Sequence, residues 1–449
     1  MSKQRIQLSD HFTYSRLLRF VLPCIGTMLF TSIYGIVDGL CVSNFVGKTA
    51  FAAVNLIMPL PMLLGTIGFM LGTGGSAIVG ITLGEGDQKK ADRYFTMFMW
   101  AALISVSVLA VLGIVFLRPI AVLLGAKGEL LDYAVRYGRI LMVSLPTFAL
   151  QNMFQSFFVT AEKPHLGFWF TVGAGCTNMV LDVLMVGIWG WGVEGAAIAT
   201  FISQLVGGVL PVFYFINRSN SSRLHLCKTS FYSKVLRDAC INGSSELMTN
   251  LSMSLVNILY NYQLLRLAGE NGVAAYGVIM YAAFLFVAVF VGYAVGSAPI
   301  VSFHYGARNH AEVHNLYRKS LRLIAVVAVT LTLASMFIIP CVARIFVGYD
   351  AELLALTSRA FRLYALSFLI MGFNVYASSF FTALGDGVTS ALISFLRTLA
   401  FQVIAILLLP LLLGIDGIWL AVTAAELAAL AVSAAMLLTK DKVFHYRKA

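Results

Sequence analysis

Two acidic side chains lie within long apolar stretches of this sequence. Asp38 falls near the end of the first stretch, and Asp182 falls well inside a later one. An acid at the centre of a bilayer costs about 2.5–3.5 kcal/mol on insertion scales, so such residues usually have a function. A carboxylate there can take up and release a proton, or bind a small cation. The alternative for Asp38 is that it only caps the outer end of its helix.

Polar side chains accompany both acids at helical spacing. Asn178 precedes Asp182 by four residues, which places both on one helix face. Thr31, Tyr34 and Asp38 follow one another at intervals of three and four residues and form a second polar face. Two acids in one polar chamber do not ionise independently, so together they can hold one proton. With oxygen ligands from neighbouring amide and hydroxyl groups they can instead hold one Na⁺.

Further polar residues extend this predicted chamber. Thr200 and Gln204 lie one turn apart on the helix after Asp182. We therefore predict a cation-coupling site at Asp38, Asn178, Asp182 and Thr200. We predict a cavity for an organic substrate from Thr31, Tyr34, Gln151, Asn152, Gln204, Asn250 and Asn257. Pro23 can leave a backbone carbonyl without its helical partner, so we expect the first helix to bend there.

The second half of the chain contains other intramembrane charges. Glu246, Arg397 and Glu426 fall in expected helices and can form a paired ion network. A structural salt bridge is the simpler interpretation of Arg397. Glu246 can also be a favourable charge at a helix N-terminus. We expect no cofactor and no metal site, since the cysteines are scattered without a CxxC pair and the histidines lie in or beside loops.

The composition shows which elements position these residues. Of the 449 residues, 59% are hydrophobic and 11% are charged, and soluble domains carry about 25% charged residues. We expect twelve transmembrane helices near 16–42, 49–83, 94–117, 136–161, 166–188, 194–216, 238–264, 272–304, 320–347, 360–384, 388–412 and 416–438. Most Lys and Arg residues then fall on one side, which predicts that both termini are cytoplasmic.

An internal repeat divides the chain into two halves. Gly74-Gly75-Ser76-Ala77-Ile78-Val79 recurs 222 positions later as Gly296-Ser297-Ala298-Pro299-Ile300-Val301. Six helices per half give both halves the same orientation, a parallel repeat about an axis along the membrane normal. We predict a six-helix lobe at 1–216, a cytoplasmic linker at 217–234 and a second six-helix lobe at 235–449. The positions equivalent to Asp38 and Asp182 are Tyr260 and Ile404, so the second lobe lacks a copy of the acidic pair.

These motifs resemble the MATE (multidrug and toxic compound extrusion) family, and are closest to its DinF-like branch. The resemblance covers essentially the whole chain. It is carried by Pro23, Tyr34 and Asp38, by the segment GGSAIVGITLGEGD that ends at Asp87, by NMVLDVLMVG around Asp182, and by GVEGAAIAT, which ends at Thr200. The NorM-like branch uses acids of the second lobe, and that pattern is not met here.

The resemblance implies an all-α polytopic membrane protein whose two pseudo-symmetric six-helix lobes form a V. It implies export of organic, cationic amphipathic compounds in exchange for inward H⁺ or Na⁺. The family's cation-linked residues match Asp38, Asn178, Asp182 and Thr200, with Tyr34 beside them and Pro23 at the helix bend. We expect a monomer in the cell membrane, whose partners are the lipid bilayer and small organic substrates.

Several alternatives remain at this point. A lipid-linked oligosaccharide flippase or a metabolite exporter of the same superfamily shares the architecture, although a flippase needs a strongly cationic cleft. A major facilitator transporter needs an acidic and basic loop motif in both halves, and the repeat at Gly306 lacks the acid. A membrane enzyme needs a nucleophile with a base or a metal cluster, and neither is present. Nucleic-acid binding needs a basic stripe on a folded domain, so we expect neither catalysis nor nucleic-acid binding.

Overall fold

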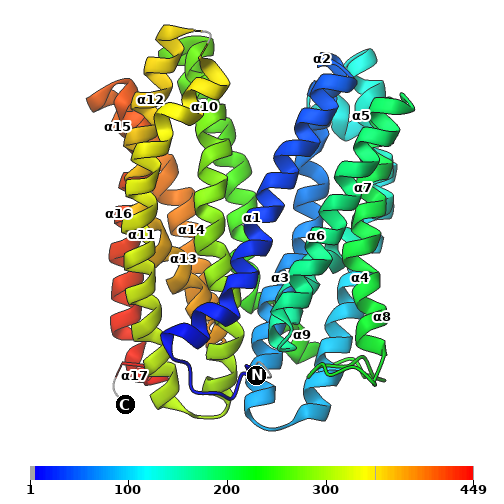
Figure 1. Cartoon of the computed structure of the whole chain (residues 1–449), viewed down its shortest axis with the longest axis vertical. Coiled ribbons are helices and arrows are strands. Elements are labelled where there is room, and N and C mark those ends of the chain that lie inside the picture. Colours follow the sequence, from blue (N-terminus) through cyan, green and yellow to red (C-terminus); the bar gives the residue numbers. More distant parts are fainter. Residues whose placement is uncertain (1–5, 349, 448–449) are drawn as a thin grey trace.

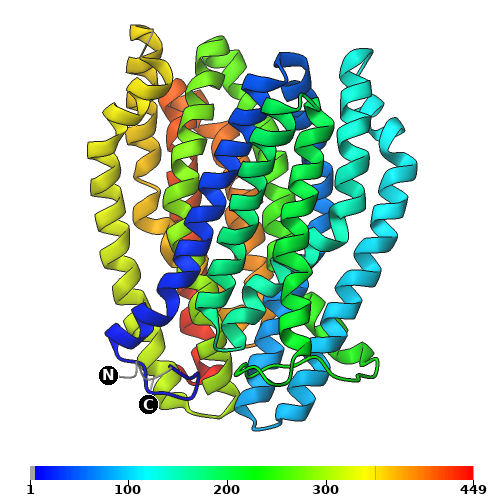
Figure 2. The same ribbon diagram turned by 45° about the vertical axis from the view of Figure 1, so that its right-hand side comes forward.

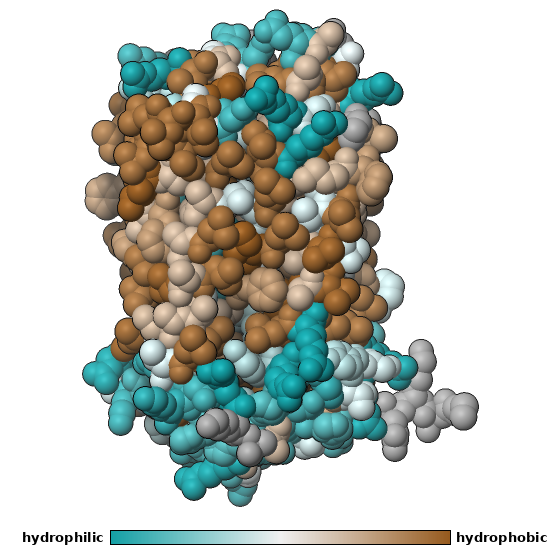
Figure 3. All heavy atoms as spheres, turned by 90° about the vertical axis from the view of Figure 1, so that its left-hand side faces the viewer, coloured by the Kyte–Doolittle hydropathy of each residue, from teal (hydrophilic) through white to brown (hydrophobic). Residues whose placement is uncertain are grey.

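The computed structural model describes residues 6–348 and 350–447, and within them the side chain of Asp38 lies outside the described part. The described elements are all helices. Helices α2 to α8 form one group and α10 to α16 the other, with α1 between them, and both groups diverge away from the end that holds both termini (Figure 1). The surface has a broad apolar band between two polar ends (Figure 3). That pattern fits a protein whose middle lies in lipid.

The first lobe contains eight α-helices and one π-helix. Long apolar stretches form the helices, and Gly or Pro residues delimit several of them: Pro59 begins α3, Pro164 begins α6, and Gly128 precedes α5. The bounds are α1 Tyr14–Phe45, α2 Lys48–Ile57, α3 Pro59–Gly84, α4 Gln88–Leu123, α5 Glu129–Thr160, α6 Pro164–Leu181, η1 Asp182–Ile188, α7 Gly192–Gly208 and α8 Leu210–Ile216.

The second lobe follows the same order, but several of its helices are broken at different places. Its helices are α9 Ser233–Asn242, α10 Ser244–Gly306, α11 His310–Val347, α12 Ala351–Ala365, α13 Phe368–Ala383, α14 Gly387–Phe395, η2 Leu396–Ala400, α15 Phe401–Leu413, α16 Ile415–Thr439 and α17 Asp441–Phe444. The sequence predicts two helices at 238–264 and 272–304. The structure has both within α10, separated by a kink at Gly269, where φ is 60° and ψ is −150°. Glycine adopts that backbone conformation without a steric penalty.

The number of spans follows from these helices. Among the described residues, nine helices are long and apolar enough to cross a membrane, and α12 with α13, bent by 46°, makes ten. Helix α10 is one of these ten, but its 63 residues form two membrane spans on either side of the kink at Gly269. Helix α5, with 32 residues, is also long enough to cross the membrane. This gives the twelve spans that the sequence predicted, in two lobes of six.

Close helix crossings join the lobes. Helix α10 of the second lobe packs extensively on α3 and α1 of the first. Gly80 of α3 faces Ser302 of α10, and a Cβ on this glycine would lie 2.8 Å from the Ser302 Cβ. These residues lie 222 positions apart, so the repeat places the approximate two-fold axis between them. Small residues allow this approach of two membrane helices.

A short N-terminal segment, residues 6–13, crosses the terminal end of the molecule and contacts both lobes (Figure 2). We call it the N-terminal strap. The Leu8 N–H donates to Oε1 of Glu162 in the first lobe at 3.0 Å, and the Phe12 N–H donates to Oε1 of Glu312 in the second lobe at 2.8 Å. Nδ1 of His11 lies 2.6 Å from Oε2 of Glu312. The strap therefore holds the lobes together at this end.

The predicted linker also bridges the lobes. The Arg223 guanidinium is 2.6 Å from Glu162 Oε1 and lies 4.8 Å from the ring centroid of Phe303 in α10. Stacking of a guanidinium on an aromatic ring adds a modest attraction. The linker boundaries at 217 and 234 stay a prediction.

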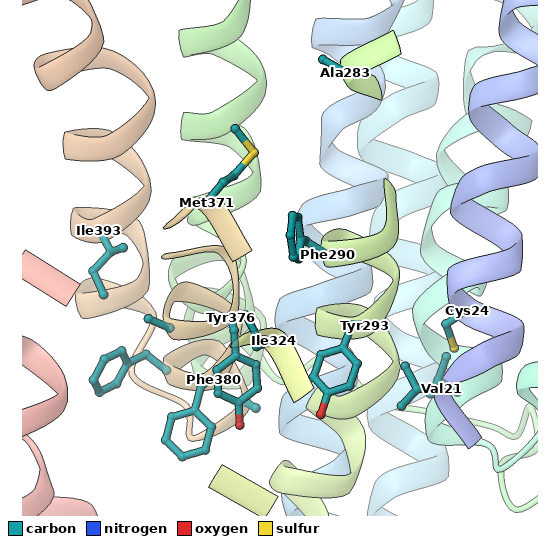
Figure 4. Packing of buried hydrophobic residues seen from close by; sticks show 14 of the residues in the cluster. Val21, Cys24, Ala283, Phe290, Tyr293, Ile324, Met371, Tyr376, Phe380 and Ile393 are labelled. Atoms are coloured by element: carbon teal, nitrogen blue, oxygen red, sulfur yellow. The ribbon is translucent and has the colours of Figure 1, made fainter. Parts of the chain in front are cut away.

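The second lobe has a dense aromatic core beside α1. Tyr293 of α10 points toward Tyr376 and Phe380 of α13, while Cys24 of α1 lies on the opposite side of α10 (Figure 4). The Tyr293 and Tyr376 ring centroids are 6.2 Å apart, and the Tyr293 hydroxyl is 2.8 Å from Ser320 Oγ. Such packing makes the second lobe a firm frame for its polar residues.

Candidate functional site

The first lobe encloses a polar cavity of about 260 Å³. Its wall comes from α1, α3, α5, α6 and α7. The Asn178 side-chain amide donates to Thr200 Oγ1 at 3.4 Å, which ties α6 to α7. Six of the predicted site residues line this one cavity: Thr31, Tyr34, Gln151, Asn178, Thr200 and Gln204.

Asp182 lies one turn beyond Asn178 and is completely buried. It begins η1, where the chain changes from an α-helix to a π-helix. Such insertions in membrane and soluble helices occur frequently at functional sites. A buried acid in the membrane region needs a compensating proton or cation.

The predicted partner acid, Asp38, lies in α1 one turn after Tyr34. Its side chain lies outside the described part of the structure, so the paired carboxylates stay a prediction. Pro23 lies within α1, and the Thr27 hydroxyl donates to the Pro23 carbonyl at 2.9 Å. Helix α1 also contacts both lobes, through α6 and α10. A change in the bend of α1 therefore alters contacts with both lobes.

Other predicted cavity residues lie elsewhere. Asn152 is buried within α5 but is not part of the cavity wall. Asn250 donates to the Glu246 carbonyl at 2.9 Å within α10. The Tyr276 hydroxyl donates to Asn257 Oδ1 at 2.7 Å. Asn250 and Asn257 thus belong to the second lobe, separate from the chamber of Asn178.

The second lobe has cavities of its own. One of about 140 Å³ is lined by Asn257, Arg397 and Glu426, among others, and a neighbouring one of about 180 Å³ by Glu246 and Arg397. Arg397 lies within the π-helix η2, so the corresponding span of each lobe carries an intramembrane ion in a π-helix. Arg397 Nη1 is 3.5 Å from Glu426 Oε1.

Sequence reasoning missed one residue of this group. The Asn374 side-chain amide donates to Glu426 Oε2 at 2.7 Å and accepts from Ser433 at 2.9 Å. Asn374 is fully buried. A single amide within the apolar segment that forms α13 was the available signal, because a buried amide needs partners.

Comparison with protein-family models identifies the family of this chain. The MatE model matches residues 23–184 and again residues 247–408, once in each half. The chain belongs to the MatE family. It is similar to the multidrug export protein MepA of Staphylococcus saprophyticus, with 21% identity over 436 residues, 96% of this chain and 95% of that protein. MepA of Staphylococcus haemolyticus is 20% identical over 385 residues, which cover 86% and 84% of the two chains.

Solved structures agree with this membership. A multidrug resistance MATE family transporter of the MOP superfamily in an outward-facing conformation matches with a TM-score of 0.92, 22% identity and full coverage of both chains. A MATE protein in the straight conformation matches with a TM-score of 0.91 and 22% identity, again over both whole chains. At this identity the likeness shows the fold. The family and the twelve-helix, two-lobe fold expected from the sequence are thus confirmed, and the chain is a multi-pass membrane protein.

Proposed function

We propose that this MatE family member is a multidrug efflux transporter that exports organic cations in exchange for inward H⁺ or Na⁺. The observation that carries the proposal is the polar first-lobe cavity one helical turn from the fully buried Asp182. The cavity wall combines amide and hydroxyl groups with apolar side chains such as Met58, Leu145 and Phe148, which suits an amphipathic compound. The names of the MepA relatives, multidrug export proteins, support the same substrate class.

The coupling follows from competition for one site. Asp182, with Asp38, Asn178 and Thr200, takes up the inward cation, and the organic cation is displaced. A ligand shifts a conformational equilibrium only by its differential affinity for the two states, so the ion and the substrate must favour opposite states. Exchange of one organic cation for one inward H⁺ or Na⁺ moves no net charge, so the work comes from the concentration gradient of the ion. Each ten-fold gradient of that ion supplies about 1.36 kcal/mol and sustains about a ten-fold gradient of the organic cation.

Alternating access uses the lobe contacts. With both termini in the cytoplasm of a cell whose plasma or inner membrane holds the protein, the strap end faces inward and is closed. The described conformation is then outward-facing. Opening inward requires the contacts of Glu162 and Glu312 with the strap to break. Both lobes and both cavities come from one chain, so we propose that a monomer completes the cycle.

Equilibrium binding of tetraphenylphosphonium to the detergent-solubilised protein tests the proposal. We expect its affinity to fall as pH falls, if H⁺ is the coupling ion, or as Na⁺ rises, if Na⁺ is. Proteoliposomes with an imposed gradient of the same ion should then extrude it. Affinity that is independent of both pH and Na⁺ would exclude competition at this site and the exchange mechanism with it.

A further inference from the structure

The two lobes contain equivalent cavities. Many wall residues of the first-lobe cavity have a counterpart 222 positions later in the wall of the 140 Å³ second-lobe cavity. The pairs are Thr31 and Met253, Tyr34 and Val256, Gly35 and Asn257, Met58 and Met280, Pro61 and Ala283, Met62 and Phe284, Thr200 and Val422, and Gln204 and Glu426. The internal repeat therefore gives each lobe a cavity at the same place, and the proposed cation exchange uses only the cavity of the first lobe.

The polarity of the two chambers differs. In the first lobe the buried acid Asp182 lies one turn from the wall residue Asn178, and among the described residues no Lys or Arg lines that wall. The second has Ile404 at the equivalent position and gains Arg397 where the first lobe has Gly175. Glycine leaves room at Gly175 for the Phe30 and Tyr34 rings. The second chamber thus has a cationic group that the first lacks.

The Arg397 guanidinium has unused hydrogen-bonding capacity. Within the described residues its only ion contact is the 3.5 Å approach to Glu426, and its buried Nε–H has no hydrogen-bond acceptor. Glu426 Oε2 is meanwhile held by Asn374. A guanidinium has five N–H donors arranged to bind a carboxylate or phosphate through two parallel hydrogen bonds. Buried donors without acceptors require an explanation, and a ligand oxyanion supplies one.

Charge balance limits what that ligand can be. Arg397 borders both second-lobe cavities, with Glu426 on the wall of one and Glu246 on the wall of the other. The two cavities thus bring one guanidinium and two acidic side chains together, and among the described residues only Glu426 lies within ion-pair distance of Arg397. A simple anion would add a further negative charge at membrane depth, whereas a zwitterion adds none. Its oxyanion can pair with Arg397 while its cationic group faces Glu246.

The remaining walls suit an amphipathic body. Tyr260 and Tyr276 stack with ring centroids 4.9 Å apart at an interplanar angle of 11°, and both line the cavity beside Met253 and Met280. Aromatic and thioether groups adapt to varied apolar shapes. The neighbouring cavity is lined by hydroxyls such as Ser245, Thr249 and Ser394, which can bind the polar end of a ligand.

We propose that the second lobe is a binding site for amphipathic zwitterions, in which Arg397 binds the carboxylate or phosphate group of the ligand and Glu246 faces its cationic group. This proposal rests on the proposed export function, because it assigns the second chamber to a further class of exported compound. It separates the tasks of the lobes: the acid of the first exchanges cations, and the arginine of the second selects oxyanions.

A matched pair of fluorescent probes tests the proposal. Nε-dansyl-lysine carries an ammonium and a carboxylate, and its methyl ester keeps the ring and ammonium but lacks the anionic group. We expect the full-length protein in detergent to bind the zwitterion about ten-fold more tightly than the ester, the preference that a charge-assisted pair supplies. Equal affinities for the two probes, or no binding of the zwitterion, would overturn the proposal.

Variants locate the preference. Arg397→Gln combined with Glu426→Gln avoids leaving a buried unpaired charge, and we expect it to lose the ten-fold preference while keeping its affinity for the ester. Arg397→Lys keeps the positive charge but lacks the planar guanidinium that can make two parallel hydrogen bonds. We expect it to lose part of the preference for the zwitterion over the ester. Arg362→Gln removes an exposed arginine from α12, and we expect it to leave the affinities for both probes unchanged. A preference that survives in both Arg397 variants would assign the oxyanion site elsewhere and refute the proposal.

The readout separates this proposal from the export function. If tetraphenylphosphonium is exchanged for H⁺ or Na⁺ but the zwitterion does not bind, only the second-lobe site fails. If Arg397-dependent zwitterion binding is found but neither ion drives export, the proposed function fails and the site stands.

Discussion

Gly84 and Gly306 lie at equivalent places where α3 and α10 cross. They are 222 positions apart, and a Cβ on either would overlap a backbone carbonyl oxygen of the other helix. For Gly84 that oxygen belongs to Phe303, and for Gly306 it belongs to Ile81, again 222 positions apart. One contact thus occurs twice, related by the approximate two-fold axis, at the end where the lobes are closed.

Substitution of either glycine should therefore have the same effect. We expect Gly84→Ala and Gly306→Ala each to destabilise the closed contact by about 1–3 kcal/mol, because backbone atoms cannot move aside as side chains can. Thermal unfolding in detergent measures this. Gly277→Ala in α10 is the control, since its Cβ meets open space, and a helical Gly→Ala change there should stabilise by about 0.5–1 kcal/mol. Equal stability of all three variants would contradict the close backbone contact between α3 and α10 at Gly84 and Gly306.

The sequence predicted the repeat that contains both glycines, but not that they face each other. A run of small residues indicates close packing without naming the partner helix, because only the assembled lobes determine which faces meet. The same limit applies to the strap. Leu8 and Phe12 are fully buried, yet they precede the first apolar stretch, and their burial depends on contacts with both lobes at once.

The candidate site was predictable to a different degree. Asn178, Thr200 and Gln204 share one cavity as helical spacing indicated, because polar residues on one face of a membrane helix must point away from lipid. The π-helices were not predictable, since an inserted residue leaves no mark in composition. Because Arg397 lies in a π-helix, regular helical spacing in the sequence could not predict that it borders two cavities.

The strap contacts predict a conformational shift. We expect Glu162→Gln combined with Glu312→Gln to move the equilibrium toward the inward-open state by about ten-fold or more, because hydrogen bonds from the strap to ionised groups are lost. Distances between spin labels on the two lobes, measured by electron spin resonance, report the change. Asp10→Asn is the control, since among the described residues the Asp10 carboxylate accepts a hydrogen bond from the Gln7 N–H of the strap and from neither lobe. An unchanged distance distribution in the double variant would show that the strap does not hold the lobes.

Asp386 predicts a pH-dependent contribution to stability. Burial acts to raise its pKa, but hydrogen bonds from Lys440 and Thr389 outweigh burial and hold the pKa below the ordinary 3.8. A lowered pKa in the folded state means that the carboxylate stabilises the fold above pH 3.8 and that this stabilisation is lost as pH falls through the folded pKa.

We therefore expect Asp386→Asn to lower stability at pH 7 by about 1 kcal/mol, a modest value because the ion pair is partly exposed. The difference from wild type should shrink steadily below pH 4 in thermal unfolding measured at each pH. Asp87→Asn is the comparison, since Asp87 caps α4 by accepting from the Lys90 N–H at 3.0 Å and has no ion pair within the part of the chain that the structure describes. A loss in Asp386→Asn that is the same at every pH would rule out the carboxylate's charge as its origin.

Asp182 provides the most direct test of coupling. Asparagine keeps the shape of the side chain but cannot exchange a proton and binds cations weakly, so Asp182→Asn should insert and fold like the wild type. We expect coupled export in proteoliposomes to fall at least ten-fold, and tetraphenylphosphonium binding to lose its dependence on pH and Na⁺. We expect the same of Asp38→Asn. Wild-type export by a well-expressed Asp182→Asn protein would refute the site.

A second substitution in the same chamber distinguishes the coupling ion. Thr200→Val introduces the residue that the second lobe has at Val422 and removes one oxygen while keeping the volume. If Na⁺ is the coupling ion, the loss of an oxygen ligand should weaken Na⁺ competition about ten-fold, because Na⁺ needs several oxygen ligands at once. If H⁺ is the coupling ion, competition should be nearly unchanged, because the proton binds the carboxylate alone. Competition curves for tetraphenylphosphonium against Na⁺ and against pH, measured in wild type and Thr200→Val, therefore assign the ion. A Thr200→Val protein with unaltered curves for both ions would show that this hydroxyl is no ligand and leave proton exchange at Asp182 as the coupling step.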